Sequence, residues 1–256
     1  SHLAKWDRSG VRLKISVNLS PTTLLAPDCA NTILSALQRW SIDRSRLTIE
    51  LLESEKLDRQ ARDAAISRLT EIGIELAMDD LGEGYSGLRR MSEVPFSTIK
   101  IDRSLMASLI PRPIQTMVVI DTLNSMSGSL GKKVVLEGLE TEAHLEMATR
   151  LGIPFGQGFG IAKPMPADDL LNWIEGFKFE SDPMQVKTYL GGLAHHWKSG
   201  HDGPLESCPI AILLATKENV PVEIIRAHAE LHSQATPDGS ATELSEWLQR
   251  AIQQEL

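Results

Sequence analysis

The sequence predicts an α/β fold, in which parallel strands alternate with helices, followed by a small helical module. Six short apolar runs recur between residues 14 and 157, and most of the segments between them have helical periodicity. The alternation stops after a polar break at 178–184 that contains a proline. In a chain of 256 residues, of which 42% are hydrophobic, these observations indicate a barrel-like domain over 1–180 and a helical appendage over 185–256.

Each predicted strand ends on a residue that can bind a metal ion or a phosphate. The strands are expected at 14–18, 47–50, 75–80, 97–100, 133–137 and 153–157. Their terminal residues are Asn18, Glu50, Asp79 with Asp80, Lys100, Glu137 and Gln157. The carboxyl ends of parallel strands meet at one edge of a sheet. These side chains therefore predict a hard-cation site beside a cationic group, which is typical of phosphoryl chemistry.

Helices are expected between and after these strands. Apolar residues at helical spacing predict helices over 28–40, 56–72, 114–130, 141–151 and 166–177 in the barrel-like part. In the appendage, helices are expected over 184–198, over 210–235 with a break near Pro221, and from Ser240 to the C-terminus.

Composition excludes several classes of protein. A net charge of −8 argues against a general nucleic-acid or anionic-membrane binder. The two cysteines, Cys29 and Cys208, do not form a disulfide framework, so a reducing compartment is expected. No run approaches the roughly 20 apolar residues of a transmembrane helix. We therefore expect a soluble, cytoplasmic protein.

The sharpest single segment is Asp79-Asp80 with the glycine-rich stretch that follows it. Two adjacent carboxylates can each face a different divalent ion, or one of them can bridge two ions. The next residues include a candidate ligand loop, made of Gly82, Gly84, Tyr85 and Ser86. Taken alone, the segment would more often be an acidic turn than a metal site.

The motifs at the strand ends, and their order along the chain, resemble those of the EAL-domain family. The segments that carry the resemblance are SVNLSP at 16–21, IELLES at 49–54, MDDLGEGYS at 78–86, IKIDRS at 99–104, VVLEGLET at 134–141 and QGFGIAKP at 157–164. The resemblance implies a modified TIM (β/α) barrel and a cyclic di-GMP phosphodiesterase, which hydrolyses its substrate to linear pGpG with two Mg²⁺ or Mn²⁺ ions. It also implies a homodimer and an upstream sensory or GGDEF-type module.

The resemblance assigns a role to each matching residue. Asn18, Glu50 and Asp79 resemble metal ligands, and Asp80 with Glu137 would serve the second ion. Lys100 resembles the residue that holds the attacking water, and Gln157 a polar group that positions that water or a ligand. Glu53 resembles the anchor of the loop 81–87, while Asp102 and Glu140 resemble supports of the ligands.

The sequence also departs from the family pattern. The Glu-Ala-Leu segment, which gives the family its name and supplies one metal-ligand glutamate, is not found before Asn18. We therefore expect a barrel that lacks its first two strands and has exposed edges. Leu81, Glu83 and Gly87 also replace residues that are usual in the loop. Two alternatives to catalysis stay open: a receptor that binds cyclic di-GMP without cleaving it, and a dimerisation platform.

The appendage carries a second candidate metal site. His228 and His232 are four residues apart and share one helix face, and His196 and Cys208 precede them. Three histidines and a cysteine could hold Zn²⁺ tetrahedrally. Their order loosely resembles the chemoreceptor zinc-binding family. The alternative is a helical bundle whose histidines are ordinary core and surface residues.

Overall fold

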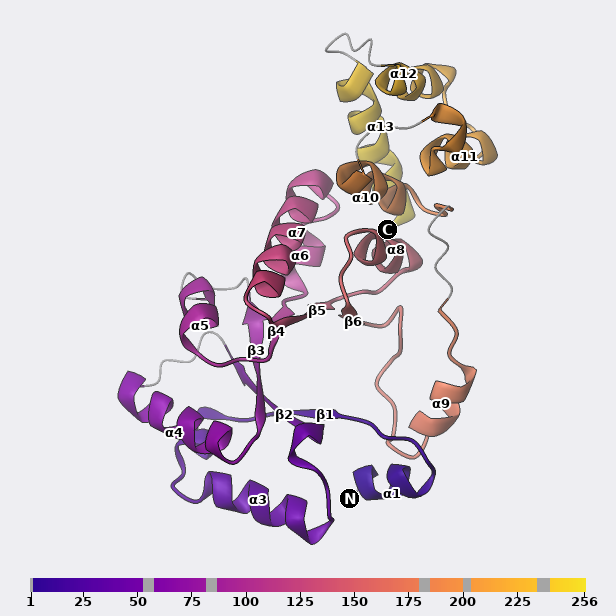
Figure 1. Cartoon of the computed structure of the whole chain (residues 1–256). Helices are drawn as coiled ribbons and strands as arrows, with labels where there is room; N and C mark the ends of the chain where they lie inside the picture. Colours follow the sequence, from indigo (N-terminus) through magenta and orange to yellow (C-terminus); the bar gives the residue numbers. More distant parts are fainter. Residues whose placement is uncertain (1, 53–57, 82–86, 180–184, 200–203, 234–239) are drawn as a thin grey trace. The chain divides into compact units, whose positions relative to one another are not determined.

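The computed structural model describes residues 2–52, 58–81, 87–179, 185–199, 204–233 and 240–256, with the backbone alone for 240–243. Six strands form one sheet in the order in which they follow along the chain (Figure 1). They are β1 (Ile15–Asn18), β2 (Leu47–Leu52), β3 (Glu75–Leu81), β4 (Thr98–Ile101), β5 (Lys133–Glu137) and β6 (Phe155–Gln157). All six predicted strands are therefore confirmed, to within two residues at each end.

Helices follow most strands and then replace them in the C-terminal part. Those of the strand-containing part are α1 (His2–Arg8), α2 (Pro21–Leu25), α3 (Cys29–Arg39), α4 (Arg59–Glu71), α5 (Gly87–Glu93), α6 (Ser104–Ala107), α7 (Pro113–Ser129), α8 (Glu142–Arg150) and α9 (Leu170–Gly176). The C-terminal helices are α10 (Tyr189–Ser199), α11 (Pro209–Thr216), α12 (Val222–His232) and α13 (Ser240–Glu255). Short 3₁₀ turns lie at Arg44–Arg46 and Leu205–Ser207. The expected α/β fold with a helical C-terminal region is confirmed, and the sheet forms part of a TIM-like barrel.

The helix over 210–235 is broken as predicted, because α11 ends at Thr216 and α12 begins after Pro221. Pro221 is the residue just before α12, where its fixed φ angle is compatible with a helix start. The short helices α1, α2, α5 and α6 were not predicted. With four to seven residues each, they are too short for a periodic pattern to reveal them.

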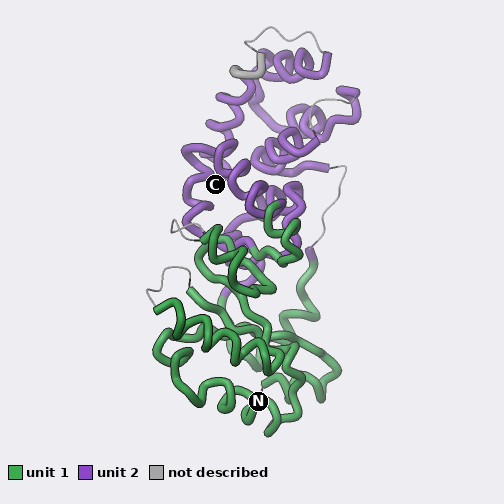
Figure 2. Tube along the Cα trace, turned by 60° about the vertical axis from the view of Figure 1, so that its left-hand side comes forward, with its two compact units in different colours: residues 1–102, 126–135, 164–178 green, residues 103–125, 136–163, 179–256 purple. Residues whose placement is uncertain are grey.

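The chain divides into two compact units, coloured separately in Figure 2. Unit 1 contains residues 1–102, 126–135 and 164–178, and unit 2 contains residues 103–125, 136–163 and 179–256. Each unit combines several parts of the chain, so the predicted domain boundary between 180 and 185 stays a prediction. Among the described residues, no helix is long and apolar enough to cross a bilayer.

The core of unit 1 lies along the central strands. Leu76, Met78, Ile99 and Ile101 of β3 and β4 are completely buried. The N-terminal helix is fixed to this core by Arg46, whose guanidinium donates to both carboxylate oxygens of Asp7 at 2.6 Å and to the Leu13 carbonyl at 2.7 Å. Both contacts to Asp7 come from one nitrogen, Nη1, of a buried guanidinium, so this is a charge-assisted ion pair between the N-terminal helix and the residue before β2.

The first strand of the sheet is more exposed than the central ones. Ser16, Val17 and Asn18 of β1 are exposed, whereas Leu47 to Leu51 of β2 are buried. Within the described sheet, β1 pairs with β2 and ends the strand order. β1 is therefore an exposed edge strand of the described sheet.

Candidate functional site

Four of the predicted site residues of unit 1 share one face of the sheet. In the parallel register, Asn18 is opposite Glu50, and Glu50 is opposite Ala77. Ala77 is opposite Thr98. Side chains two residues apart on a strand point to the same face, so Asp79 and Lys100 lie on the face of Ala77 and Thr98. Strand period and register thus bring Asn18, Glu50, Asp79 and Lys100 to one side.

Three of these residues form a buried ion cluster. The Lys100 ammonium lies 2.9 Å from a Glu50 carboxylate oxygen and 2.8 Å from Asp79 Oδ1. Each of the three side chains is only 9% exposed. Buried charges require paired partners, and here one cation stands between two anions. The cluster keeps an excess of negative charge, which suits it to a further cation.

A β-bulge brings the two adjacent aspartates together. Met78 pairs with Ile99 and Leu81 with Ile101, so Asp79 and Asp80 of β3 both lie opposite Lys100 alone. Asp80 has a φ of +59°, a left-handed conformation that few residues other than glycine adopt. Adjacent residues of a regular strand would point to opposite faces. Here their carboxylate oxygens lie within 4.8 Å of one another.

The donor atoms in unit 1 fit a hard divalent cation. Asp79 and Asp80 offer carboxylate oxygens within bridging range, and Glu50 adds a third carboxylate on the same face. Asn18 offers an amide oxygen and is exposed. Oxygen-only donors match the preference of Mg²⁺ and Mn²⁺, whereas zinc prefers nitrogen and sulfur. Strained backbone conformations such as that of Asp80 occur preferentially at functional sites.

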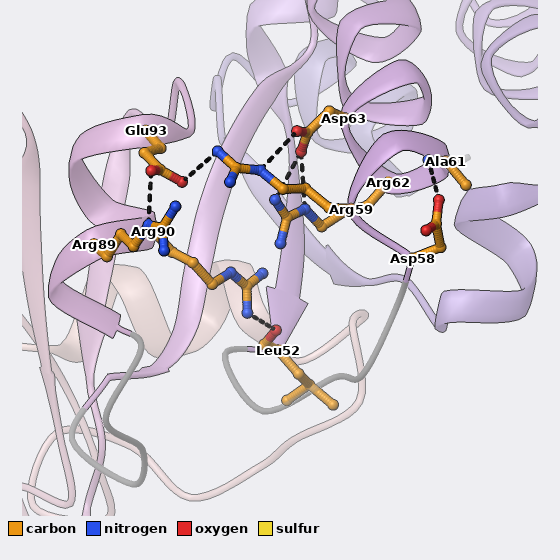
Figure 3. Close-up of polar contacts among 9 residues, drawn as sticks. All are labelled: Leu52, Asp58, Arg59, Ala61, Arg62, Asp63, Arg89, Arg90 and Glu93. Atoms are coloured by element: carbon orange, nitrogen blue, oxygen red, sulfur yellow. Dashed lines mark hydrogen bonds and ion pairs between the residues drawn. The ribbon is translucent and has the colours of Figure 1, made fainter.

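A residue that the sequence did not single out supports the end of β2. Arg90 of α5 is buried and donates to the Leu52 carbonyl at 3.0 Å (Figure 3). Around it, Arg59 of α4 and Arg89 both contact the Glu93 carboxylate, at 3.1 and 2.8 Å. The hydrogen bond from Arg89 holds the pKa of Glu93 below its usual value. These contacts join α4 and α5, the helices that follow β2 and β3.

Several predicted residues lie outside the described part of the chain. They are Glu53 and the candidate ligand loop of Gly82, Gly84, Tyr85 and Ser86. Asp102, in contrast, is described and buried, and its backbone N–H donates to the Leu81 carbonyl just after the bulge. The role predicted for Asp102 as a support of the ligands therefore has a suitable position.

In unit 2, the segments after β5 and β6 are joined by backbone hydrogen bonds. Leu139 N–H donates to the Gln157 carbonyl at 3.1 Å, and the Leu139 carbonyl accepts from Gly160 at 2.8 Å. A Cβ atom at Gly158 would overlap the backbone of Leu139, so this close approach requires glycine. Glu137 at the end of β5 is half-buried, and Gln157 at the end of β6 is exposed.

Glu140 is exposed, and its backbone takes part in a helix start. Its N–H donates to Nδ1 of His144 at 3.2 Å, in the first turn of α8. This bond requires an imidazole without a proton on Nδ1. Burial lowers the pKa of His144, because the charged form is the one that loses hydration. The neutral form of His144 therefore accepts this hydrogen bond and holds the loop between Glu137 and α8.

The four predicted residues of the appendage are also brought together. One ligand atom from each of His196, Cys208, His228 and His232 lies within 4.8 Å of the others. Their donor atoms are nitrogen and sulfur, unlike the oxygens of the first cluster.

Comparison with known proteins identifies relatives for the strand-containing part. The family model described as "EAL domain" matches residues 1–164. The bifunctional diguanylate cyclase/cyclic di-GMP phosphodiesterase MucR of Pseudomonas aeruginosa is 35% identical over 158 residues, which are 61% of this chain and 23% of that protein. The cyclic di-GMP phosphodiesterase RocR of the same organism is 31% identical over 173 residues, 67% of this chain and 44% of that protein. The chain thus spans less than half the length of these relatives.

Solved structures have the same fold. The EAL domain of Mycobacterium smegmatis DcpA matches with a TM-score of 0.64 at 25% identity, over 70% of this chain and 81% of that one. The PaMucR phosphodiesterase in complex with c-di-GMP matches with a TM-score of 0.61 at 33% identity, over 66% of this chain and 69% of that one.

Proposed function

The chain belongs to the EAL domain family, and from this premise we propose that it hydrolyses cyclic di-GMP to linear pGpG. The observation that carries the proposal is the buried Glu50–Lys100–Asp79 cluster beside the left-handed Asp80. Its residues occur at the positions where the family resemblance expects metal ligands and a lysine. Two relatives named as cyclic di-GMP phosphodiesterases give the substrate of this proposal.

The residues proposed to hold two Mg²⁺ or Mn²⁺ ions are the oxygen donors at the strand ends. Asn18, Glu50 and Asp79 would hold one ion, with Asp79 shared, and Asp80 with Glu137 would serve the other. When bound, such ions polarise the phosphodiester and supply a nucleophilic water at neutral pH. The donor set supports this choice of ions, because every one of these groups binds through oxygen.

The remaining residues are proposed to handle the water and the phosphate. Hydrolysis adds one water across a P–O bond, leaving a 5′-phosphate and a free 3′-hydroxyl. Lys100 is proposed to orient that water by hydrogen bonding and to balance the phosphate charge, for which its ammonium is already desolvated. Gln157 would position the water or the ligand. Glu53, the ligand loop, Asp102 and Glu140 keep the supporting roles that the resemblance implies.

Two other functions compete with catalysis. A receptor would bind cyclic di-GMP through the same residues without cleaving it, and a dimerisation platform would do neither. The expected homodimer, the upstream sensory or GGDEF-type module and the cytoplasmic location also belong to this proposal and stay predictions. The Glu-Ala-Leu glutamate that is not found before Asn18, together with the departures at Leu81, Glu83 and Gly87, keeps the receptor in consideration.

One set of assays separates the three functions. The chain is incubated with cyclic di-GMP and Mg²⁺ or Mn²⁺, pGpG is quantified by chromatography, and binding is measured by calorimetry with Ca²⁺ in place of the active ions. Metal-dependent pGpG formation is expected. Tight binding without pGpG formation would favour the receptor. If the chain neither binds cyclic di-GMP nor forms pGpG, only the dimerisation platform remains. Asp63→Asn, an exposed carboxylate on α4, is the matched control variant.

A further inference from the structure

The C-terminal helices enclose a compact cluster of three histidines and one cysteine. His196 is on α10, Cys208 is the residue before α11, and His228 and His232 are one turn apart on α12. The three elements are drawn in brown to yellow in Figure 1. Twelve residues separate the first two ligand candidates and twenty separate Cys208 from His228, so folding, not proximity in sequence, assembles the group.

The distances within the cluster fit a tetrahedral metal site. Nε2 of His196 lies 3.2 Å from Cys208 Sγ and 3.2 Å from Nε2 of His228, and the Cys208 Sγ to His228 Nε2 distance is 3.5 Å. In tetrahedral zinc sites, bond lengths of about 2.0–2.1 Å to nitrogen and 2.3 Å to sulfur separate the ligand atoms by roughly 3.3 Å (N to N) and 3.6 Å (N to S). The His196–His228 and Cys208–His228 edges are close to these values, and the His196 Nε2–Cys208 Sγ edge is shorter.

The fourth candidate completes the arrangement. The ring centre of His232 lies 4.9 Å from that of His228 and 5.6 Å from that of His196. Residues four apart on a helix lie on the same face, so α12 presents two imidazoles to the point that His196 and Cys208 approach from other elements. Cys208 precedes the first turn of α11, and the positive end of that helix suits an anionic sulfur ligand.

The surroundings are those of a closed site. His228 is 1% exposed, Cys208 5% and His196 7%. Leu193, Leu213 and Leu231 of the same helices are also buried, so apolar side chains shield the cluster from water. A cavity of about 230 Å³ beside the cluster has His196 and Trp197 in its lining. Four protein donors and little water are typical of structural zinc, whereas catalytic zinc keeps one open position.

The helix that carries His196 is also fixed to α8. The Glu146 carboxylate of α8 accepts from the backbone N–H groups of Lys187 and Thr188, at 3.0 and 2.9 Å, and from the Thr188 hydroxyl at 2.6 Å. These groups lie just before α10, where a negative charge stabilises the helix. Arg150, at the end of α8, donates to the Gln185 carbonyl. Constraining α10 therefore also constrains its attachment to α8.

We propose that His196, Cys208, His228 and His232 bind one zinc ion, and that this ion holds α10, α11 and α12 together as the body that docks on α8. Nitrogen and sulfur donors select zinc over the hard ions of the oxygen-lined cluster. A helical module of this size has a small core, and a structural metal is one of the ways by which such modules become stable. The proposal does not depend on phosphodiesterase activity.

Metal analysis of the full chain tests the site. The protein is purified without a histidine tag and without chelators, and zinc is measured by mass spectrometry. We expect one zinc per chain in the wild type and in Cys29→Ser, which changes the other buried cysteine. Cys208→Ala should lose the stoichiometric zinc. Folded wild-type protein that contains no zinc and takes up none on addition would overturn the proposal and identify the cluster as a hydrogen-bonded core.

Two further measurements use the wild type, so their outcome does not depend on whether a variant folds. After chelation, added Co²⁺ should produce the visible and charge-transfer absorption of a tetrahedral thiolate site, and Mn²⁺ should not compete for it. Amide hydrogen exchange of residues 142–150 should become faster when zinc is removed and recover when zinc, but not Mn²⁺, is restored. An absent cobalt spectrum would refute the site, and unchanged exchange would refute its link to α8.

Discussion

At the scale of single residues, Lys100 sets the charge balance of the candidate site. Its ammonium lies between the carboxylates of Glu50 and Asp79, and all three side chains are buried. Without it, two negative charges would face each other away from water. The desolvation cost of two such carboxylates is offset only if another cation replaces the lysine. The same residue can therefore serve both stability and catalysis.

Replacing Lys100 by methionine should show how much this residue contributes to stability. We expect Lys100→Met to lower the free energy of unfolding by about 3–5 kcal/mol in the absence of divalent ions, the usual cost of breaking a buried pair. Mn²⁺ should restore part of it, because a ligand that binds only the folded state stabilises it. Urea unfolding with and without Mn²⁺ measures both effects. Lys14→Met, in an exposed pair with Glu75, should cost less than about 1 kcal/mol; equal losses in both variants would contradict this account.

His144 should make stability depend on pH. Burial lowers the pKa of His144 in the folded chain, while the unfolded chain keeps the ordinary value near 6.5. Above pH 6.5 both states are neutral at this site, and its contribution to stability is fully present. As the pH falls below 6.5 toward the lowered folded pKa, the unfolded state takes up the proton first, and stability is lost.

The variant His144→Asn isolates that effect. The asparagine amide oxygen can still accept the Glu140 N–H, but it does not titrate. Denaturant midpoints between pH 7.5 and 5 should fall less steeply in His144→Asn than in the wild type. Parallel curves for the two proteins would show that His144 is not responsible for the pH dependence.

At the scale of elements, the strand ends were predictable and their exact geometry was not. Apolar runs with a polar last residue identified β1 to β6, because that pattern depends only on local sequence. The bulge at Asp79–Asp80 was not predicted, since it depends on the register between β3 and β4. Arg90 was missed for a similar reason: only the folded chain brings α5 to the end of β2.

Close packing between the segments after β5 and β6 gives a prediction at this scale. Gly158→Ala places a methyl group against the Leu139 backbone, so we expect a loss of about 1–3 kcal/mol from overpacking. Gly128→Ala is the matched control, because a Cβ there meets no atom within 4 Å and lies inside α7. It should gain up to about 1 kcal/mol from helix propensity. Thermal unfolding of both variants measures the difference, and a neutral Gly158→Ala would refute the requirement for glycine.

At the scale of the whole molecule, the chain contains two clusters of different metal preference. One uses carboxylates and an amide at strand ends of unit 1, and the other uses imidazoles and a thiol in the helices of unit 2. Sequence reasoning found both sets of residues, because ligand type and spacing are local properties. It could not establish that the tail residues converge, since His196 and His228 meet only through helix packing.

The central claim concerns the oxygen-lined cluster and its chemistry. The chain matches the EAL domain over residues 1–164 and spans less than half the length of MucR and RocR, so the test uses this chain itself. Asp79 is the residue to change, because it contacts Lys100 and lies beside Asp80 at the bulge. Asp63→Asn, whose side chain is 49% exposed, controls for the loss of one charge.

The most direct measurement is the rate of pGpG formation from cyclic di-GMP as Mn²⁺ is titrated. We predict Mn²⁺-dependent hydrolysis by the wild type and by Asp63→Asn. Asp79→Asn should be slower by roughly 10²–10⁴-fold, because losing a shared ligand removes several kcal/mol of stabilisation at about 1.4 kcal/mol per tenfold in rate. Folded wild-type chain that forms no pGpG at saturating Mn²⁺, or an Asp79→Asn variant as fast as the wild type, would contradict the claim.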